Sequence, residues 1–242
     1  MEQEIKAQID RAKELLDALR ESCNQDLQSH TISDKTKNLT QEILVKMRSV
    51  FDQSMYKFFN EKITPNLTAD KKDKAKVYFP IVLDKNSLKS TLGRGMMSDF
   101  EQNYPAVFNF LESVQPYADK YKWMEAFSNF ANEKHIRLTP QKRVESKRLT
   151  ISSGGASMSI GQGASISIGS GASISLGGRR ITGGQKIDAD SNIIYGDPNL
   201  DIKKEIWVSF TLADTNINSL WLCEIVITEG EKIISDFFKL FQ

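Results

Sequence analysis

Apolar residues recur at helical spacing from the N-terminus. In the first segment they fall at alternating steps of four and three and form one seam: Ile5, Ile9, Ala12, Leu16, Leu19 and Cys23. Glu and Lys fill most of the remaining positions, so the pattern predicts an amphipathic helix. The seam spans about three heptads, which suits either a helix that lies on its own domain or a short coiled coil between copies.

Four further helices are predicted before residue 140, at about 34–64, 87–92, 105–115 and 121–135. Ser33 and Asp34 are residue types that favour a helix N-terminus, and Pro105 suits the first turn of the fourth helix. Gly93 and Gly95 bracket a break after the third helix, which we interpret as a helix C-cap. The charged stretch 71–76 (KKDKAK) is expected to be a solvated turn.

An eight-residue repeat begins where the helical pattern stops. GASMSIGQ (155–162), GASISIGS (163–170) and GASISLGG (171–178) are three copies, and RLTISSGG (148–155) is a degenerate copy before them. Apolar residues alternate with serine in each copy, as in a strand with one apolar and one hydroxyl face. Because eight is even, each copy returns the same face to the core. One predicted row holds Ile160, Ile168 and Leu176, and the other holds Met158, Ile166 and Ile174.

The repeat is expected to be either an antiparallel meander or a short rolled solenoid. The alternative is a flexible Ser/Gly linker, but a linker does not need alternating Ile, Met and Leu. Residues 149–178 include no charged side chain. Charges are the usual protection of a strand edge against pairing with other chains, so the repeat favours self-association.

After the repeat, strands are predicted at 205–212 and 221–228, joined as a hairpin and followed by a helix at about 230–241. The apolar face of that helix is expected to cover the sheet or to dock on the first domain. The predicted fold class is α+β, with a helical domain at 1–147 and a β-repeat domain, including the C-terminal helix, at 148–242.

Charge changes at the same boundary. Residues 1–150 carry 25 basic and 21 acidic side chains, whereas residues 151–242 carry 7 and 10, and the whole chain has a net charge of +1. Global charge therefore does not favour a protein that coats nucleic acid or an anionic membrane. No segment reaches about 18 consecutive apolar residues, and the first ten residues are not those of a signal peptide. We expect a cytoplasmic protein without a membrane partner.

Little in the sequence points to a metal or a cofactor. Cys23 and Cys223 lie 200 positions apart, and His30 and His135 are the two histidines, so no zinc-ligand spacing occurs. The chain also lacks a phosphate-binding loop, a His-Glu-x-x-His motif and a nucleophile elbow. We predict no metal site and no cofactor.

One stretch, residues 114–143, has chemical character. Asn129 and Asn132 precede Lys134 and His135 at the end of a helix that bears a Trp, with Gln-Pro-Tyr before it and Leu and Pro after it. This arrangement resembles HEPN-like bacterial proteins. The resemblance implies a small helical bundle, often dimeric, whose active members are metal-independent ribonucleases with an Arg a few residues before a catalytic His. Here the positions four to seven before His135 hold Ala, Phe, Asn and Ser.

The same residues can also be interpreted without the family resemblance. On a helix Asn129, Asn132 and His135 share one stripe at i, i+3 steps, and an imidazole can act as general acid or base. The alternative is that these three side chains cap the helix and hold the following loop. Catalytic candidates are therefore His135, Asn129 and Asn132.

A local excess of positive charge follows this stripe. Residues 134–148 include six basic side chains and one acidic side chain, Glu145, which gives a local charge of +5. They are the candidate nucleic-acid contacts: Lys134, Arg137, Lys142, Arg143, Lys147 and Arg148. Tyr117, Tyr121 and Trp123 are the nearest candidates for base stacking.

Two functions remain open from the sequence. The first is a non-enzymatic intracellular bacterial protein that assembles as a homo-oligomer, with a HEPN-like helical domain and a β-repeat association module. The second is a metal-independent ribonuclease or RNA-binding effector in defence or stress response that uses His135.

Overall fold

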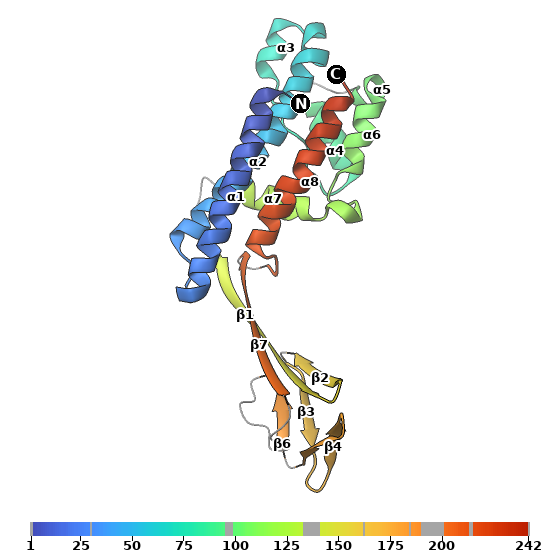
Figure 1. Ribbon diagram of the computed structural model, residues 1–242. Coiled ribbons are helices and arrows are strands. Elements are labelled where there is room, and N and C mark those ends of the chain that lie inside the picture. The colour runs from blue at the N-terminus through green and yellow to red at the C-terminus, as the bar shows by residue number, and fades with distance from the viewer. Residues whose placement is uncertain are drawn as a thin grey trace. The chain divides into compact units, whose positions relative to one another are not determined.

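The computed structural model describes residues 2–29, 31–94, 99–132, 141–161, 163–183, 185–189, 201–212 and 215–241. The chain divides into two compact units (Figure 1). The helical unit contains residues 1–142 and 210–242, and the strand unit contains residues 143–209. The fold class is α+β, as the sequence predicts.

Three long helices form the body of the helical unit: α1 (Gln3–Ser29), α2 (Asp34–Phe58) and α8 (Ser219–Lys239). Each packs on the other two (Figure 1). The apolar seam of α1 is buried in these contacts, and Ile9, Ala12 and Leu19 are fully buried. The seam is therefore used within the chain, which rules against the coiled-coil interpretation.

Shorter helices complete the helical unit. After α2 come a π-helical turn η1 (Phe59–Ile63), a 3-10 turn η2 (Thr64–Asn66) and α3 (Ala69–Lys74). They are followed by α4 (Lys85–Arg94), α5 (Phe100–Asn103), α6 (Pro105–Ser113), η3 (Asp119–Tyr121) and α7 (Trp123–Asn132). The predicted helices are confirmed at α2, α4, α6 and α7. The predicted solvated turn at 71–76 is wrong, because Ala and Lys are strong helix formers and α3 covers most of it.

Aromatic rings fill the interior between these helices. Phe58 of α2 lies 5.9 Å from Phe237 and 5.2 Å from Phe241, measured between ring centroids. Further along α2, Phe51 lies 4.9 Å from Phe79 in an edge-to-face arrangement. Such pairs stabilise a core beyond the area they bury. The aromatic interior thus joins residues that are far apart in the sequence.

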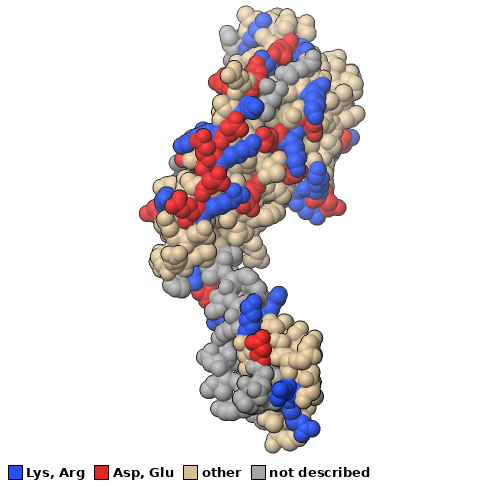
Figure 2. Space-filling view, viewed as in Figure 1, with Lys and Arg blue, Asp and Glu red and all other residues tan. Residues whose placement is uncertain are grey.

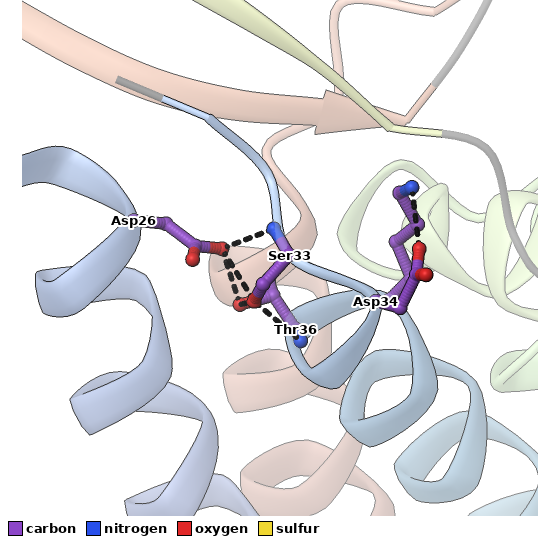
Figure 3. Close-up of polar contacts among 5 residues, drawn as sticks. Asp26, Ser33, Asp34 and Thr36 are labelled. Atoms are coloured by element: carbon purple, nitrogen blue, oxygen red, sulfur yellow. Dashed lines mark hydrogen bonds and ion pairs between the residues drawn. The ribbon is translucent and has the colours of Figure 1, made fainter. Parts of the chain in front are cut away.

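A buried carboxylate closes the corner between α1 and α2 (Figure 3). One oxygen of Asp26 accepts hydrogen bonds from the Ser33 backbone N–H at 2.9 Å, the Ser33 hydroxyl at 3.1 Å and the Thr36 hydroxyl at 2.6 Å. Thr36 also shares a 2.8 Å hydrogen bond with Ser22. Ser33 is the N-cap of α2, as the sequence predicts. These bonds fix the start of α2 on the end of α1.

Seven strands are described: β1 (Gln141–Ser153), β2 (Ala156–Gly161), β3 (Ser165–Ile168), β4 (Ser173–Leu176), β5 (Arg179–Thr182), β6 (Gln185–Asp188) and β7 (Asp201–Leu212). One sheet has the order β2-β1-β7, and β1 and β2 form an antiparallel hairpin. Strands β4 and β5 pair antiparallel, as do β3 and β6. Because β4 and β5 are adjacent in the chain, these four strands form one bent hairpin.

Glycine turns create the bends at the period of the repeat. The N–H of Ala164 donates to the Gly161 carbonyl at 3.1 Å, and eight residues later Ala172 donates to Gly169 at 3.0 Å. Gly171 has φ +82°, which the third position of a type II turn requires. The degenerate copy in β1 pairs with the first full copy in β2, but among the described residues the three full copies do not pair with one another, so the repeat is not a continuous meander.

The described interior of the strand unit is aliphatic. Among the side chains that the structure describes, its buried cluster consists of Leu149, Ile151, Ile160, Ile168, Ile181 and Ile187. Both predicted rows point toward this cluster, while the serines of β2, β3 and β4 are exposed. Met158, Ile166, Ile174 and Leu176 pack against it but remain partly exposed. The linker interpretation is therefore wrong, and one copy of the chain covers its apolar face incompletely.

The predicted C-terminal hairpin is wrong at its second strand. Residues 221–228 belong to α8, whose N-cap Asn218 accepts a hydrogen bond from the Trp221 N–H at 2.9 Å. The run Ile225–Thr228 is β-branched and favours a strand locally, but burial at helical spacing decides the structure. The predicted domain 148–242 also grouped the C-terminal helix with the repeat, whereas α8 packs on α1 and α2.

Candidate functional site

The structure describes only part of the predicted catalytic stripe. Asn129 and Asn132 are both exposed on α7, which ends at Asn132. The Asn132 side chain donates a long hydrogen bond of 3.4 Å to the Ser128 hydroxyl. Lys134, His135 and Arg137 lie outside the described residues, as does His30. The predicted grouping of His135 with the two asparagines therefore stays a prediction.

The remaining candidate nucleic-acid contacts lie on β1. Arg143 pairs with Glu145, so part of the local positive charge is compensated. Side chains alternate between the two faces of a strand, which separates Arg143 and Lys147 from Arg148. The backbone of Lys142 is in β1, but its side chain is outside the description. The described basic side chains of β1 therefore do not form one continuous face.

The three candidate stacking residues differ in exposure. Trp123 is 5% exposed and packs on Phe127, with ring centroids 6.2 Å apart. Tyr117 is 38% exposed, and Tyr121 is half-buried under the Lys120 ammonium. Only the two tyrosines offer surface to a partner. Figure 2 shows Lys and Arg intermixed with Asp and Glu on the visible face of the helical unit.

Both cysteines are buried and reduced. Burial raises the pKa of the Cys23 thiol to about 11, and burial also raises the pKa of Cys223. A thiol that stays protonated at neutral pH is a poor nucleophile and a poor metal ligand. In the described part of the chain no group of three His, Cys, Asp or Glu side chains has a metal-binding arrangement.

The most developed polar arrangement lies elsewhere, on α2. The guanidinium of Arg48 pairs with Asp52, with Nε 3.2 Å from Oδ2 and Nη2 3.0 Å from Oδ1. Both groups also bind the backbone of Phe79: Asp52 accepts from its N–H and Arg48 donates to its carbonyl, each at 3.0 Å. This pair therefore holds an extended segment against α2.

We call that segment, Val77–Val82, the strap. It has no regular secondary structure, and a second anchor holds its other end. Gln115 is fully buried; its amide nitrogen donates to the Pro80 carbonyl at 3.0 Å, and its oxygen accepts from the Val82 N–H at 2.9 Å. Side chains on helices thus supply the hydrogen bonds that a neighbouring strand supplies in a sheet.

Two hollows lie along the strap and share Arg48, Asp52 and Tyr78. The smaller, of about 250 Å³, is further lined by α2 residues such as Ser49 and Tyr56. The larger, of about 550 Å³, reaches Thr91 of α4 and Ser128 and Asn132 of α7. We call the two together the Arg48 groove. Of the predicted site residues Asn132 lines it, whereas Asn129 does not.

Sequence reasoning missed Arg48 and Asp52. Their i, i+4 spacing on a helix gives a local signal for an ion pair, but such pairs are usually solvated. Their second partner, Phe79, is 31 and 27 positions away, and no pattern in the sequence links it to them.

Comparison with protein families, curated proteins and solved structures found no match to this chain. The HEPN resemblance is therefore not tested. Among the helices that the structure describes, none is both long and apolar enough to cross a membrane.

Proposed function

We propose that this chain is an interaction protein that assembles with further copies of itself through the strand unit. The observation that carries the proposal is the small size of the described interior of that unit. The unit spans residues 143–209, and among its described side chains the buried cluster consists of six, all of them Leu or Ile. Units of fewer than about 70 residues usually need a disulfide, a metal or oligomerisation to be stable. Neither cysteine of the chain lies within 143–209.

The strands that carry the repeat also have unpaired edges. In the described part of the chain β2 pairs only with β1, β3 only with β6, and β4 only with β5. These three strands contain no charged residue, and charges are what normally prevents pairing between edges of different molecules. Partly exposed Met158, Ile166 and Ile174 lie on the same strands. Pairing with a second copy would satisfy the edges and cover these side chains.

Light scattering on the intact chain and on a charge-bearing edge variant tests the proposal. The unmodified chain is expected to have a mass that is a multiple of 27.3 kDa at micromolar concentration. Ser157→Lys, on the exposed face of edge strand β2, should shift the mass toward that of the monomer. The matched control is Thr150→Lys on β1, the central strand of the same sheet. It adds the same charge away from the edge and should leave the mass unchanged.

A monomeric unmodified chain would overturn the proposal. An equal effect of the two lysine variants would show that association uses the face of the sheet and not its edge. The ribonuclease alternative needs His135, which the structure does not describe, and it stays a prediction from the sequence. Cleavage of single-stranded RNA that His135→Ala abolishes, without a loss of thermal stability, would favour that alternative.

A further inference from the structure

The Arg48 groove contains an unsatisfied hydrogen-bond donor. Nε and Nη2 of Arg48 are used by Asp52 and by the Phe79 carbonyl. Nη1 is shielded from solvent and has no hydrogen-bond partner in the part of the chain that the structure describes. A buried donor without an acceptor is unfavourable, so an acceptor oxygen from a bound molecule would be stabilised there.

The charge of the groove selects the kind of acceptor. Among its described lining residues, Arg48 and Asp52 carry the only charges, and they neutralise each other. The rest of the polar lining consists of hydroxyl and amide groups, among them Ser49, Ser128 and Asn132. A phosphate would bring negative charge close to the Asp52 carboxylate without a free cation to balance it. A neutral carbonyl oxygen meets no such repulsion.

The strap offers backbone groups of its own. Within the described chain, no hydrogen bond is formed by the backbone of Tyr78 or Ile81, although their neighbours Phe79 and Pro80 are anchored. An extended backbone with unpaired groups is what an added peptide strand pairs with. Tyr56 and Tyr78, which line the groove, are 53% and 57% exposed, and tyrosine is enriched at protein interfaces.

From these observations we infer that the Arg48 groove binds an extended, uncharged peptide segment of a partner protein. A peptide carbonyl accepts from Arg48 Nη1, and the peptide backbone lies along the strap between Tyr78 and Asn132. The larger hollow, of about 550 Å³, is within the range of ~300–1,000 Å³ that is typical of binding sites. This inference concerns the helical unit alone and does not depend on assembly through the strand unit.

The test uses a display library of random linear heptapeptides, selected against the full chain. Peptides without charged central residues are expected to be enriched and to bind with micromolar affinity. Their binding should shift the NMR signals of the Arg48 guanidinium. Asn132→Arg fills the groove from an exposed position on α7 and should weaken binding by about tenfold or more.

Asn129→Arg is the matched control, because Asn129 is exposed on the same helix but does not line the groove. It should leave the affinity within about twofold of the original value. The inference is overturned if no enriched peptide distinguishes the two variants, or if the enriched peptides are consistently acidic. It is also overturned if inorganic phosphate or polyuridylate shifts the Arg48 signals and displaces the peptides, since the groove would then be an anion or RNA site.

Discussion

Asp26 shows how one buried carboxylate can organise a helix connection. Three donors converge on one of its oxygens, and Asp26, Thr36 and Ser22 are all buried. Asp26→Ala should lower the free energy of unfolding by about 3 kcal/mol, because it leaves buried donors without an acceptor. Urea denaturation measures this change.

The control lies at the start of α2, the helix whose N-terminus Asp26 holds. Asp34 forms an ion pair with Lys37, and its side chain is 80% exposed (Figure 3). Asp34→Ala should cost no more than about 0.5 kcal/mol, as expected for a solvated charge near a helix N-terminus. Equal losses for the two variants would contradict the role assigned to Asp26.

The buried thiol of Cys23 predicts a dependence on alkaline pH. Its pKa is raised to about 11 in the folded chain, whereas an unfolded thiol titrates near ~8.5. The unfolded state therefore loses this proton at a lower pH than the folded state does. The contribution of the protonated thiol to the free energy of unfolding is fully present below the lower pKa and is lost as the pH rises through the higher pKa. Between these pH values the free energy of unfolding should fall more steeply for the native sequence than for Cys23→Ala. Parallel curves in urea denaturation at several pH values would contradict this.

Single residues were predictable from the sequence where the signal is local. Ser33 caps α2 as its residue type predicts, and Ile160 and Ile168 are buried as the alternation predicts. The role of Arg48 was not predictable, because it depends on a contact with the strap that only the tertiary fold creates.

At the scale of elements, close approach of two glycine turns shapes the strand unit. Gly177 has φ +54°, and a Cβ at this position would overlap the carbonyl oxygen of Ser153. Gly177→Ala should therefore disrupt the strand unit and increase hydrogen exchange throughout β4 and β5. The control is Gly178→Ala, where φ is +79° but the added methyl meets no atom within 4 Å. It should cost only about 1 kcal/mol. Equal effects would show that the turns do not touch.

The alternation within the repeat leads to a second prediction for these strands. Ile168 of β3 belongs to the buried cluster, and its neighbour Ser167 is exposed. Ile168→Asp buries an unpaired charge, which costs several kcal/mol and should leave residues 149–178 unprotected in hydrogen exchange. Ser167→Asp places the same group in water and should preserve the protection. Loss of protection in both variants would contradict the assigned faces.

Element type was predictable where periodicity and local propensity agree, as in α2, α6 and the repeat strands. It failed in α8, where a β-branched run from Ile225 to Thr228 favours a strand locally. In the structure Val226 and Ile227 of this run are buried. One turn further on, Gly230 packs so closely on α2 that a Cβ added to it would lie 3.0 Å from Cε of Met47. Packing against a helix that is far away in the sequence therefore decided the conformation.

At the scale of the whole molecule, the first and the last described helices, α1 and α8, pack together in the helical unit. Helix α1 packs on α2 and α8, and Lys13 and Arg20 of α1 pair with Glu231 and Glu224 of α8. No local pattern in the sequence indicates that the C-terminal helix packs on α1. The sequence therefore led us to group this helix with the repeat that precedes it. The packing of α1 on α2 and α8 means that removing α1 would expose the core of the helical unit. Truncation is therefore unsuitable as a test of association.

Hydrogen exchange as a function of protein concentration tests the assembly through the strand unit most directly. If copies pair through the edges of the repeat strands, amides of β2, β3 and β4 should become more protected as the concentration rises from submicromolar to tens of micromolar. Amides of β1, the central strand of its sheet, should change little. Protection that is the same at all concentrations, together with a mass of 27.3 kDa, would contradict the account.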